Sequence, residues 1–178
     1  PEQVGISSED IQRYVDRLEQ YQLSTHSLLI ARGDDIVLEK YWEPFGPEYL
    51  HRQYSASKSI VSIAVGFAIQ DGYFSLDDKM IDLFPKELEN QPEPYIRNQT
   101  VRNMLMMSTS HIDQGWFKGH TTTDRVQHYF DCHSMCKPRP GGANFVYDSE
   151  GSFVLGALVE RKTGKSLIEY LNEKLYSK

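Results

Sequence analysis

A serine and a lysine three residues apart, Ser55 and Lys58, have types and spacing that suit nucleophilic chemistry. On a helix, side chains at i and i+3 project from one face. A serine at a helix start can attack a carbonyl carbon while its own N–H holds the developing oxyanion, because the first N–H groups of a helix lack partners. A lysine can accept the serine proton only when it is neutral, which desolvation favours. The pair therefore predicts acyl transfer through Ser55.

The helix that must position this pair is predicted over residues 55–70, with Asp71-Gly72 as its C-cap. Its apolar positions leave no consistent polar face, which predicts burial on all sides. Because the chain contains sixteen serines and ten lysines, about one Ser-x-x-Lys match is expected by chance. A second match does occur, at Ser134 and Lys137, but it lies in a polar, proline-containing loop. We interpret that second match as the chance one.

The other elements are one helix, a hairpin and several further helices. Ser7 precedes apolar residues at helical spacing, which predicts a helix that ends near Tyr21. Two β-rich runs, 27–32 and 36–42, predict an antiparallel hairpin. Further helices are predicted at 100–107, 123–132, 151–162 and 166–175. The predicted fold class is α/β (α+β), with residues 1–54 in the sheet region and residues 55–178 in the helical region.

The residues around Ser55 also resemble a known family. Ser-x-x-Lys is the first signature of the serine β-lactamases and penicillin-binding proteins (DD-peptidases). Matches to the class C-like branch keep their order and spacing over nearly all of the chain, at 54–60, 66–72, 76–81, 84–85 and 100–110. The resemblance implies a β-lactamase-like fold. In that fold an N-terminal helix and a β-hairpin of the main sheet come first, and the mainly α-helical region follows.

The second signature of that branch, Tyr-x-Asn, follows a Pro-Gly-rich loop, and Tyr147 occupies its first position. By resemblance, Tyr147 exchanges protons with Ser55 and the leaving group, together with Lys58. Ser149 stands where asparagine is usual, and a hydroxyl lacks the second donor of the amide. This difference favours an ester or peptide substrate over a β-lactam. Ser149 and Trp116 are the candidate substrate-binding residues; for Tyr147 taken alone, core packing is the alternative.

The third family signature, Lys/His-Thr/Ser-Gly, lies on a strand well downstream in the family. Lys162-Thr163-Gly164 matches its letters but falls between two predicted helices, and we interpret it as a helix C-cap. The resemblance therefore covers about half of the usual domain, and the C-terminal part of the sheet is missing. Since part of the domain is missing, we expect a fragment with little activity alone. Its unpaired strand edges favour association with further strands. A C-terminal half or a homo-oligomer would complete the sheet.

No metal site, nucleic-acid partner or membrane segment is predicted. Asp124, His128, Cys132 and Cys136 are spaced by four and are competent zinc ligands, but four collinear side chains cannot surround one ion. The net charge of −6 argues against a nucleic-acid partner. No apolar run is long enough to span a bilayer. Residues 1–20 lack a signal-peptide pattern; the compartment stays open at this point, with the cytoplasm as the favoured one.

Together these features predict a serine hydrolase that acts through an acyl-enzyme and needs no cofactor. Its substrate would be a small or peptide-like molecule with an ester, amide or β-lactam carbonyl. Two alternatives stay open: a non-catalytic penicillin-binding or sensor-like protein on the same scaffold, and an inactive half-chain with an assembly role. An acyl group that stays on Ser55 would indicate the sensor-like protein.

Overall fold

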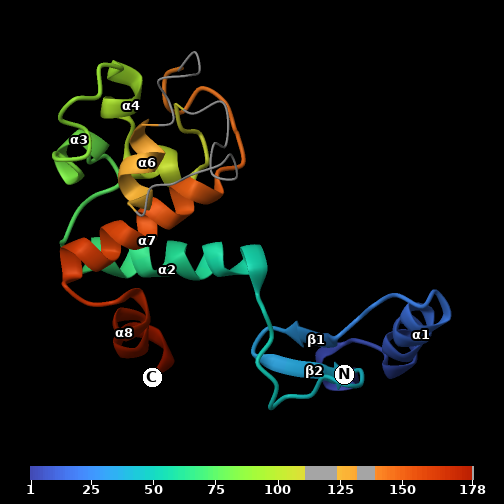
Figure 1. Cartoon of the computed structure of the whole chain (residues 1–178). Helices are drawn as coiled ribbons and strands as arrows, with labels where there is room; N and C mark the ends of the chain where they lie inside the picture. The colour runs from blue at the N-terminus through green and yellow to red at the C-terminus, as the bar shows by residue number, and fades with distance from the viewer. Residues whose placement is uncertain (111–123, 132–138, 178) are drawn as a thin grey trace. The chain divides into compact units, whose positions relative to one another are not determined.

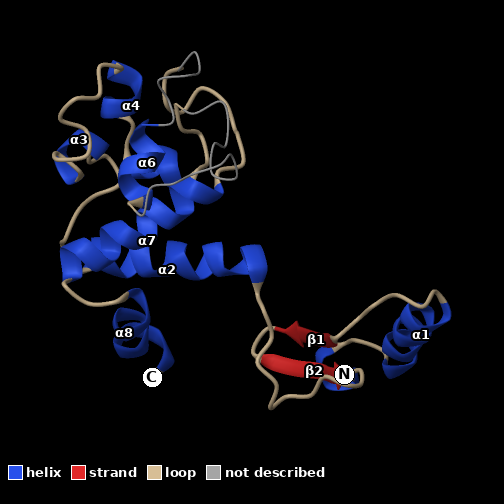
Figure 2. Cartoon of the chain, in the orientation of Figure 1, coloured by secondary structure: helices blue, strands red, loops and turns tan. Residues whose placement is uncertain are grey.

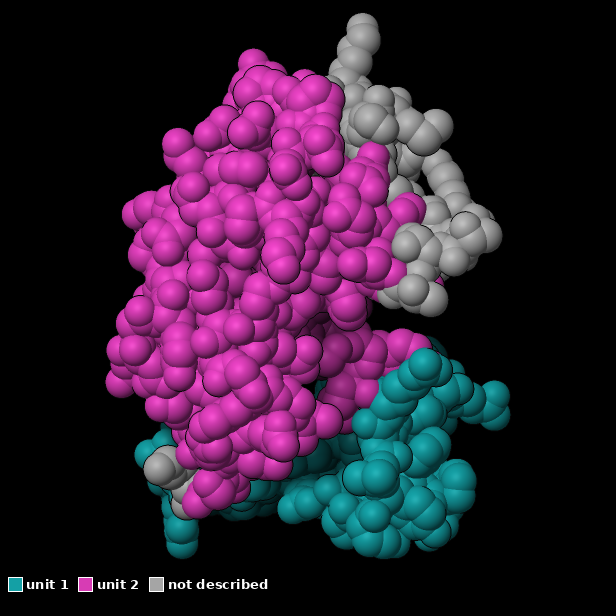
Figure 3. Space-filling view, turned by 60° about the vertical axis from the view of Figure 1, so that its left-hand side comes forward, with its two compact units in different colours: residues 1–52 teal, residues 53–178 magenta. Residues whose placement is uncertain are grey.

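The computed structural model describes residues 1–110, 124–131 and 139–177 (Figure 1). The chain forms two compact units, residues 1–52 and residues 53–178 (Figure 3). Within the described residues, no helix combines the length and apolar character needed to cross a membrane. The assignment of residues 1–54 and 55–178 to two regions of one larger domain stays a prediction.

The first unit contains the predicted helix and hairpin. A 3-10 turn at Glu2–Val4 (η1) precedes α1, Ser8–Gln20, and α1 is followed by strands β1, Ser27–Arg32, and β2, Asp35–Tyr41. The strands pair antiparallel, with a register shift between Ile30 and Ala31. The second strand begins and ends one residue earlier than predicted, because Arg32 pairs with Asp35 and leaves a two-residue turn.

The second unit begins with the segment that carries the candidate nucleophile. Tyr54–Ala56 is a 3-10 turn (η2), and helix α2 follows at Ser57–Gln70. The α-helix thus begins two residues later than predicted. Tyr54 has a φ of 46°, in the left-handed region, and its carbonyl accepts a hydrogen bond from the Ser57 hydroxyl at 2.5 Å. This tight turn holds Ser55 just ahead of the regular helix.

Within the described residues helix α2 is only partly buried, so the prediction of burial on all sides is wrong. Ala64, Val65 and Ala68 are buried, and α2 contacts α7 and α8. Ile63 is 39% exposed, and Gly66 is also exposed. Apolar composition makes burial favourable, but a helix face is buried only where another element packs against it.

The remaining elements of the second unit are helical (Figure 2). They are α3 (Met80–Leu83), α4 (Pro94–Asn98), α5 (Val101–Leu105), α6 (Arg125–Asp131), α7 (Ser149–Thr163), α8 (Leu167–Leu171) and a π-helical turn (η5, Asn172–Tyr176). The short helices α3 and α4 were not predicted. Gly164 has a φ of 70° and its N–H donates to Glu160 O at 2.9 Å. The predicted C-cap at residues 162–164 is therefore confirmed.

The hydrophobic core of the second unit surrounds α7. Helix α7 contacts α2, α5, α6 and α8, and its Leu158 and Val159 are fully buried. The largest fully buried side chains of this core are Tyr129, Tyr170, Phe84, Phe130, Met80, Leu88, Ile96 and Met104. This packing fixes the start of α7 relative to α2, and the candidate site lies where those two segments begin.

Candidate active site

Three predicted site residues meet at one hydroxyl. The Ser55 Oγ accepts hydrogen bonds from Lys58 Nζ at 3.1 Å and from the Tyr147 hydroxyl at 2.8 Å. Lys58 Nζ also lies 5.1 Å from the centre of the Tyr147 ring. Tyr147 is 92 positions from Ser55 in the sequence. The fold of the second unit therefore brings a serine, an amine and a phenol into direct contact.

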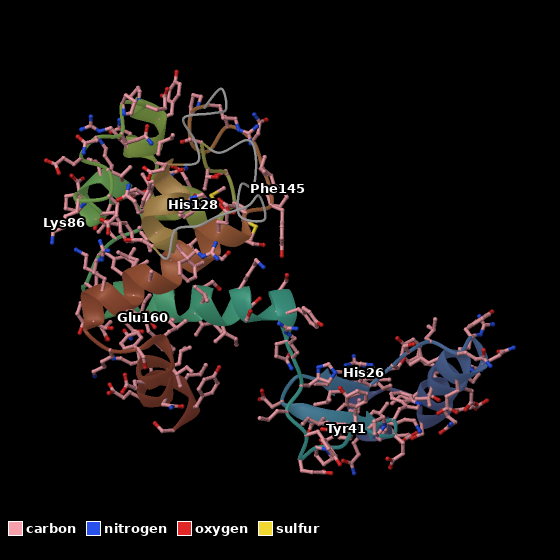
Figure 4. All side chains as sticks on the ribbon, in the orientation of Figure 1. His26, Tyr41, Lys86, His128, Phe145 and Glu160 are labelled. Carbon is pink, nitrogen blue, oxygen red and sulfur yellow. The ribbon has the colours of Figure 1, made fainter. Side chains whose placement is uncertain are left out.

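Different local structures hold the three side chains. Ser55 lies in the 3-10 turn and Lys58 in the first turn of α2. Tyr147 lies in the segment before α7, where Val146 N donates to Met107 O at 2.8 Å. Along this segment Phe145 and Tyr147 are exposed, whereas Asp148 is buried. Figure 4 labels Phe145 on this segment, ahead of α7. This alternation directs Tyr147 toward Ser55 and Asp148 into the protein.

The surroundings of the Tyr147 phenol favour its ionised form. The hydrogen bond with Ser55, then the hydrogen bond and charge of Lys58, lower the pKa of Tyr147 from its ordinary value. The Ser149 hydroxyl makes a smaller contribution in the same direction. A phenol with a lowered pKa is ionised to a larger extent near neutral pH, and its phenolate form can accept a proton from a neighbouring hydroxyl. The arrangement can thus move a proton between Ser55 and Tyr147.

The backbone of the turn offers a donor at the same place. Ala56 N donates to Gln53 O at 3.0 Å, whereas the N–H of Ser55 donates to no other group of the described residues. A free N–H beside a nucleophilic hydroxyl can stabilise negative charge on a carbonyl oxygen under attack. The local geometry is therefore compatible with one half of an oxyanion hole.

The other predicted site residues have different outcomes. Ser149 is the first residue of α7, half-buried, with its hydroxyl beside the Tyr147 phenol. Trp116 lies outside the described residues, as do Cys132 and Cys136, two of the four residues that were considered as zinc ligands and not predicted to bind metal. Asp124 and His128 are described, and within the described residues no three His, Cys, Asp or Glu side chains converge to hold a metal ion.

Sequence reasoning missed Asp148. This carboxyl is 5% exposed, caps α7 through Gly151 N at 2.7 Å, and accepts from Thr109 Oγ1 at 3.2 Å and from the Tyr129 hydroxyl at 3.1 Å. An aspartate directly before a helix is an N-cap signal, so the cap was detectable. Its contacts with Thr109 and Tyr129 were not, because both partners are distant in sequence.

Comparison with known proteins places the chain in a family. The family model described as Beta-lactamase matches residues 11–178. Among solved structures, an octameric penicillin-binding protein homologue from Pyrococcus abyssi is 20% identical, with a TM-score of 0.74; the match covers 97% of this chain and 43% of that one. FmtA from Staphylococcus aureus is 16% identical with a TM-score of 0.73, over 95% of this chain and 48% of that one.

A third structure extends the range of relatives. The D-amino acid amidase from Ochrobactrum anthropi SV3, complexed with D-phenylalanine, is 20% identical with a TM-score of 0.56, over 75% of this chain and 36% of that one. The chain thus spans less than half the length of these three solved structures. The likeness to them shows a shared fold. Because the family model covers nearly the whole chain, this protein belongs to the β-lactamase family and carries part of the β-lactamase-like fold.

Proposed function

We propose that this chain carries the acylation centre of a serine hydrolase, with Ser55 as the nucleophile, Tyr147 as the proton-transfer group and Lys58 as the cation that stabilises the Tyr147 phenolate. The observation that supports the proposal most is the convergence of Lys58 Nζ and the Tyr147 hydroxyl on Ser55 Oγ, at 3.1 and 2.8 Å. Membership in the β-lactamase family supports the same chemistry. Penicillin-recognising enzymes use a Ser-x-x-Lys serine for acyl transfer.

In the first step, ionised Tyr147 accepts the proton of Ser55, and Ser55 Oγ forms a bond to the carbonyl carbon of the substrate. The carbonyl oxygen becomes negatively charged and is held by the Ser55 N–H. Tyr147 then gives its proton to the leaving nitrogen or oxygen, and the bond to the leaving group breaks. The positive charge of Lys58 stabilises the phenolate between these transfers.

In the second step, water attacks the acyl-enzyme. Tyr147 accepts a proton from the water as the water oxygen forms a bond to the acyl carbon, and it then gives that proton to Ser55 Oγ as the bond between the acyl carbon and Ser55 breaks. The products are the free acid and the regenerated serine. The chemistry needs no metal or cofactor.

Ser149 directs our proposal for the substrate class. A hydroxyl in place of an amide offers fewer hydrogen bonds to a substrate amide, and the Ser149 hydroxyl already lies beside the Tyr147 phenol. We therefore propose an ester or a small peptide-like amide as the substrate, with a β-lactam as the less favoured one. Trp116 remains a candidate for substrate contact.

The hairpin supports a proposal about assembly. Leu29 on β1 and Ile36 on β2 are 54% and 61% exposed. Exposed apolar side chains on a two-stranded sheet favour pairing with further strands. We propose that a C-terminal half or a second copy of the chain covers them. Sedimentation of the chain alone should then show self-association; a monodisperse, fully active monomer would contradict this proposal.

Intact-mass spectrometry tests the catalytic proposal. The chain is incubated with a fluorophosphonate and, separately, with a penicillin, and wild type is compared with Ser55→Ala. Ser59→Ala is the matched control, since Ser59 is an exposed serine one helical turn further along α2. We expect one fluorophosphonate adduct in wild type and Ser59→Ala and none in Ser55→Ala.

The time course separates the remaining alternatives. An adduct with an activated ester that disappears over time, with release of the acid, indicates a hydrolase. An acyl group that remains on Ser55 indicates a sensor-like binding protein. If wild type does not react, the assay is repeated with a C-terminal half from a family member. Absence of labelling there too would refute Ser55 as an activated nucleophile.

A further inference from the structure

Asp148 is a buried carboxyl that the proposed chemistry does not use. Only 5% of the residue is exposed, and burial raises the pKa of its carboxyl. Burying a carboxyl group is unfavourable unless hydrogen-bond donors compensate for lost water. Three donors do so here: Gly151 N, Thr109 Oγ1 and the Tyr129 hydroxyl. A buried and hydrogen-bonded carboxyl directly after Tyr147 therefore suggests a function that the proposed chemistry does not include.

The three donors come from three separate parts of the second unit. Gly151 lies in the first turn of α7, Thr109 follows α5, and Tyr129 lies on α6 and is fully buried. The Asp148 carboxyl therefore ties α7, α6 and the segment after α5 to one point. That point is one residue from the phenol that contacts Ser55.

The start of α7 is shaped to admit this carboxyl. A Cβ atom added to Gly151 would lie 2.6 Å from Asp148 Oδ2 and 2.9 Å from its Cγ, which is closer than real Cβ contacts. A side chain at residue 151 would thus displace the carboxyl. Gly156, on the same helix, differs: its added Cβ would lie 3.6 Å from Leu167 Cδ2, an ordinary contact.

We propose that Asp148 is a positioning residue, which fixes the backbone at the start of α7 so that the Tyr147 hydroxyl stays within hydrogen-bond reach of Ser55. This inference rests on the proposed function. The margin is narrow: a displacement of about 1 Å would lengthen the 2.8 Å contact beyond a hydrogen bond. Misplacements of about 1 Å can slow an enzymatic step about 100-fold.

Four variants separate positioning from general stability. Asp148→Ala removes the carboxyl, and Gly151→Ala displaces it while every hydrogen-bonding side chain remains. Gly156→Ala is the matched control, because it makes the same chemical change on the same helix without crowding. Asp148→Asn is the conservative variant: its amide can accept from Gly151 N and donate to the Thr109 and Tyr129 oxygens, whose hydroxyl hydrogens can rotate.

Two measurements are made on these variants at a temperature where circular dichroism shows each to be folded. The Tyr147 pKa is followed by NMR of ¹³Cζ-labelled tyrosine, with the resonance assigned by its loss in Tyr147→Phe. Fluorophosphonate inactivation is resolved into kinact and KI. In Asp148→Ala and Gly151→Ala we expect the Tyr147 pKa to rise toward its ordinary value and kinact to fall about 100-fold, with KI unchanged. In Gly156→Ala and Asp148→Asn we expect the Tyr147 pKa and kinact to stay near their wild-type values.

The outcomes distinguish this inference from the proposed function. An unchanged Tyr147 pKa and unchanged kinact in both Asp148→Ala and Gly151→Ala would overturn the positioning role, even if Ser55 reacts. A wild-type protein that never labels refutes the proposed function, while the NMR titration still reports whether Asp148 holds Tyr147 near Lys58. If Asp148→Ala does not fold, the Tyr147 pKa and kinact of Gly151→Ala decide whether Asp148 has a positioning role.

Discussion

Helices α2 and α7 lie against each other, and both consist largely of apolar and small residues, yet they are buried to different extents (Figure 1). Eight residues of α7 are buried, compared with three of α2. Several helices pack on α7, whereas one face of α2 remains exposed. The difference indicates that the contacts of α7 stabilise the unit, whereas the exposed start of α2 leaves the proposed nucleophile, Ser55, accessible.

The largest expected effect is at the exposed start of α2. Lys58→Ala should slow fluorophosphonate labelling of Ser55 about 100-fold or more, because the hydrogen bond and the charge that lower the pKa of Tyr147 are lost. Melting temperature should barely change. The control is Lys162→Ala, a lysine at the far end of α7. Equal labelling rates in the two variants would contradict the role assigned to Lys58.

The pH dependence of labelling should follow the Tyr147 phenol. The lowered pKa of Tyr147 places its ionised form at lower pH than that of an ordinary tyrosine. Labelling should rise about tenfold per pH unit and level off with a midpoint below the usual value of about 10. In Ser149→Ala the midpoint should move slightly upward, because the smallest of the stabilising contacts is lost. If the pH midpoint of labelling is the same in Tyr147→Phe as in wild type, Tyr147 is not the group whose ionisation controls the rate.

Substitutions on the buried side of α7 should affect the stability of the unit. Leu158→Ala should lower the free energy of unfolding by about 2–5 kcal/mol, because Leu158 is fully buried and its removal leaves a cavity. Ile63→Ala on the exposed face of α2 should cost much less, since Ile63 is 39% exposed. Urea denaturation measures both. Similar losses would show that the exposed face of α2 is covered in solution.

The smallest expected effect concerns the far end of α2. The Tyr170 hydroxyl donates to Asp71 Oδ2 at 2.8 Å, at the C-cap of the helix. Tyr170→Phe should lower the free energy of unfolding by about 1 kcal/mol, the usual contribution of one hydrogen bond. Tyr176→Phe is the control, because Tyr176 is 58% exposed. Labelling of Ser55 should stay at the wild-type rate in both, and a large loss would extend the functional region to α8.

Most secondary structure and the candidate site residues followed from the sequence. The helix 8–20, the hairpin, and the caps at residues 71–72 and 164 were predictable, because caps and turns depend on neighbours in the chain. Ser55 and Lys58 were linked by their spacing, and Tyr147 by the resemblance to a family. The short helices α3 and α4 were not predictable, since so few residues leave no period to recognise.

The tertiary structure decided three further features. It left one face of α2 exposed, where apolar composition had predicted burial. It set Ser55 in a 3-10 turn ahead of the helix, through the left-handed Tyr54. It also joined Asp148 to Thr109 and Tyr129, residues 39 and 19 positions away. Local sequence determines which elements form because their hydrogen bonds and caps are short-range. Which faces are buried, and which distant side chains meet, depends on the packing of those elements, and that arises only when the chain has folded.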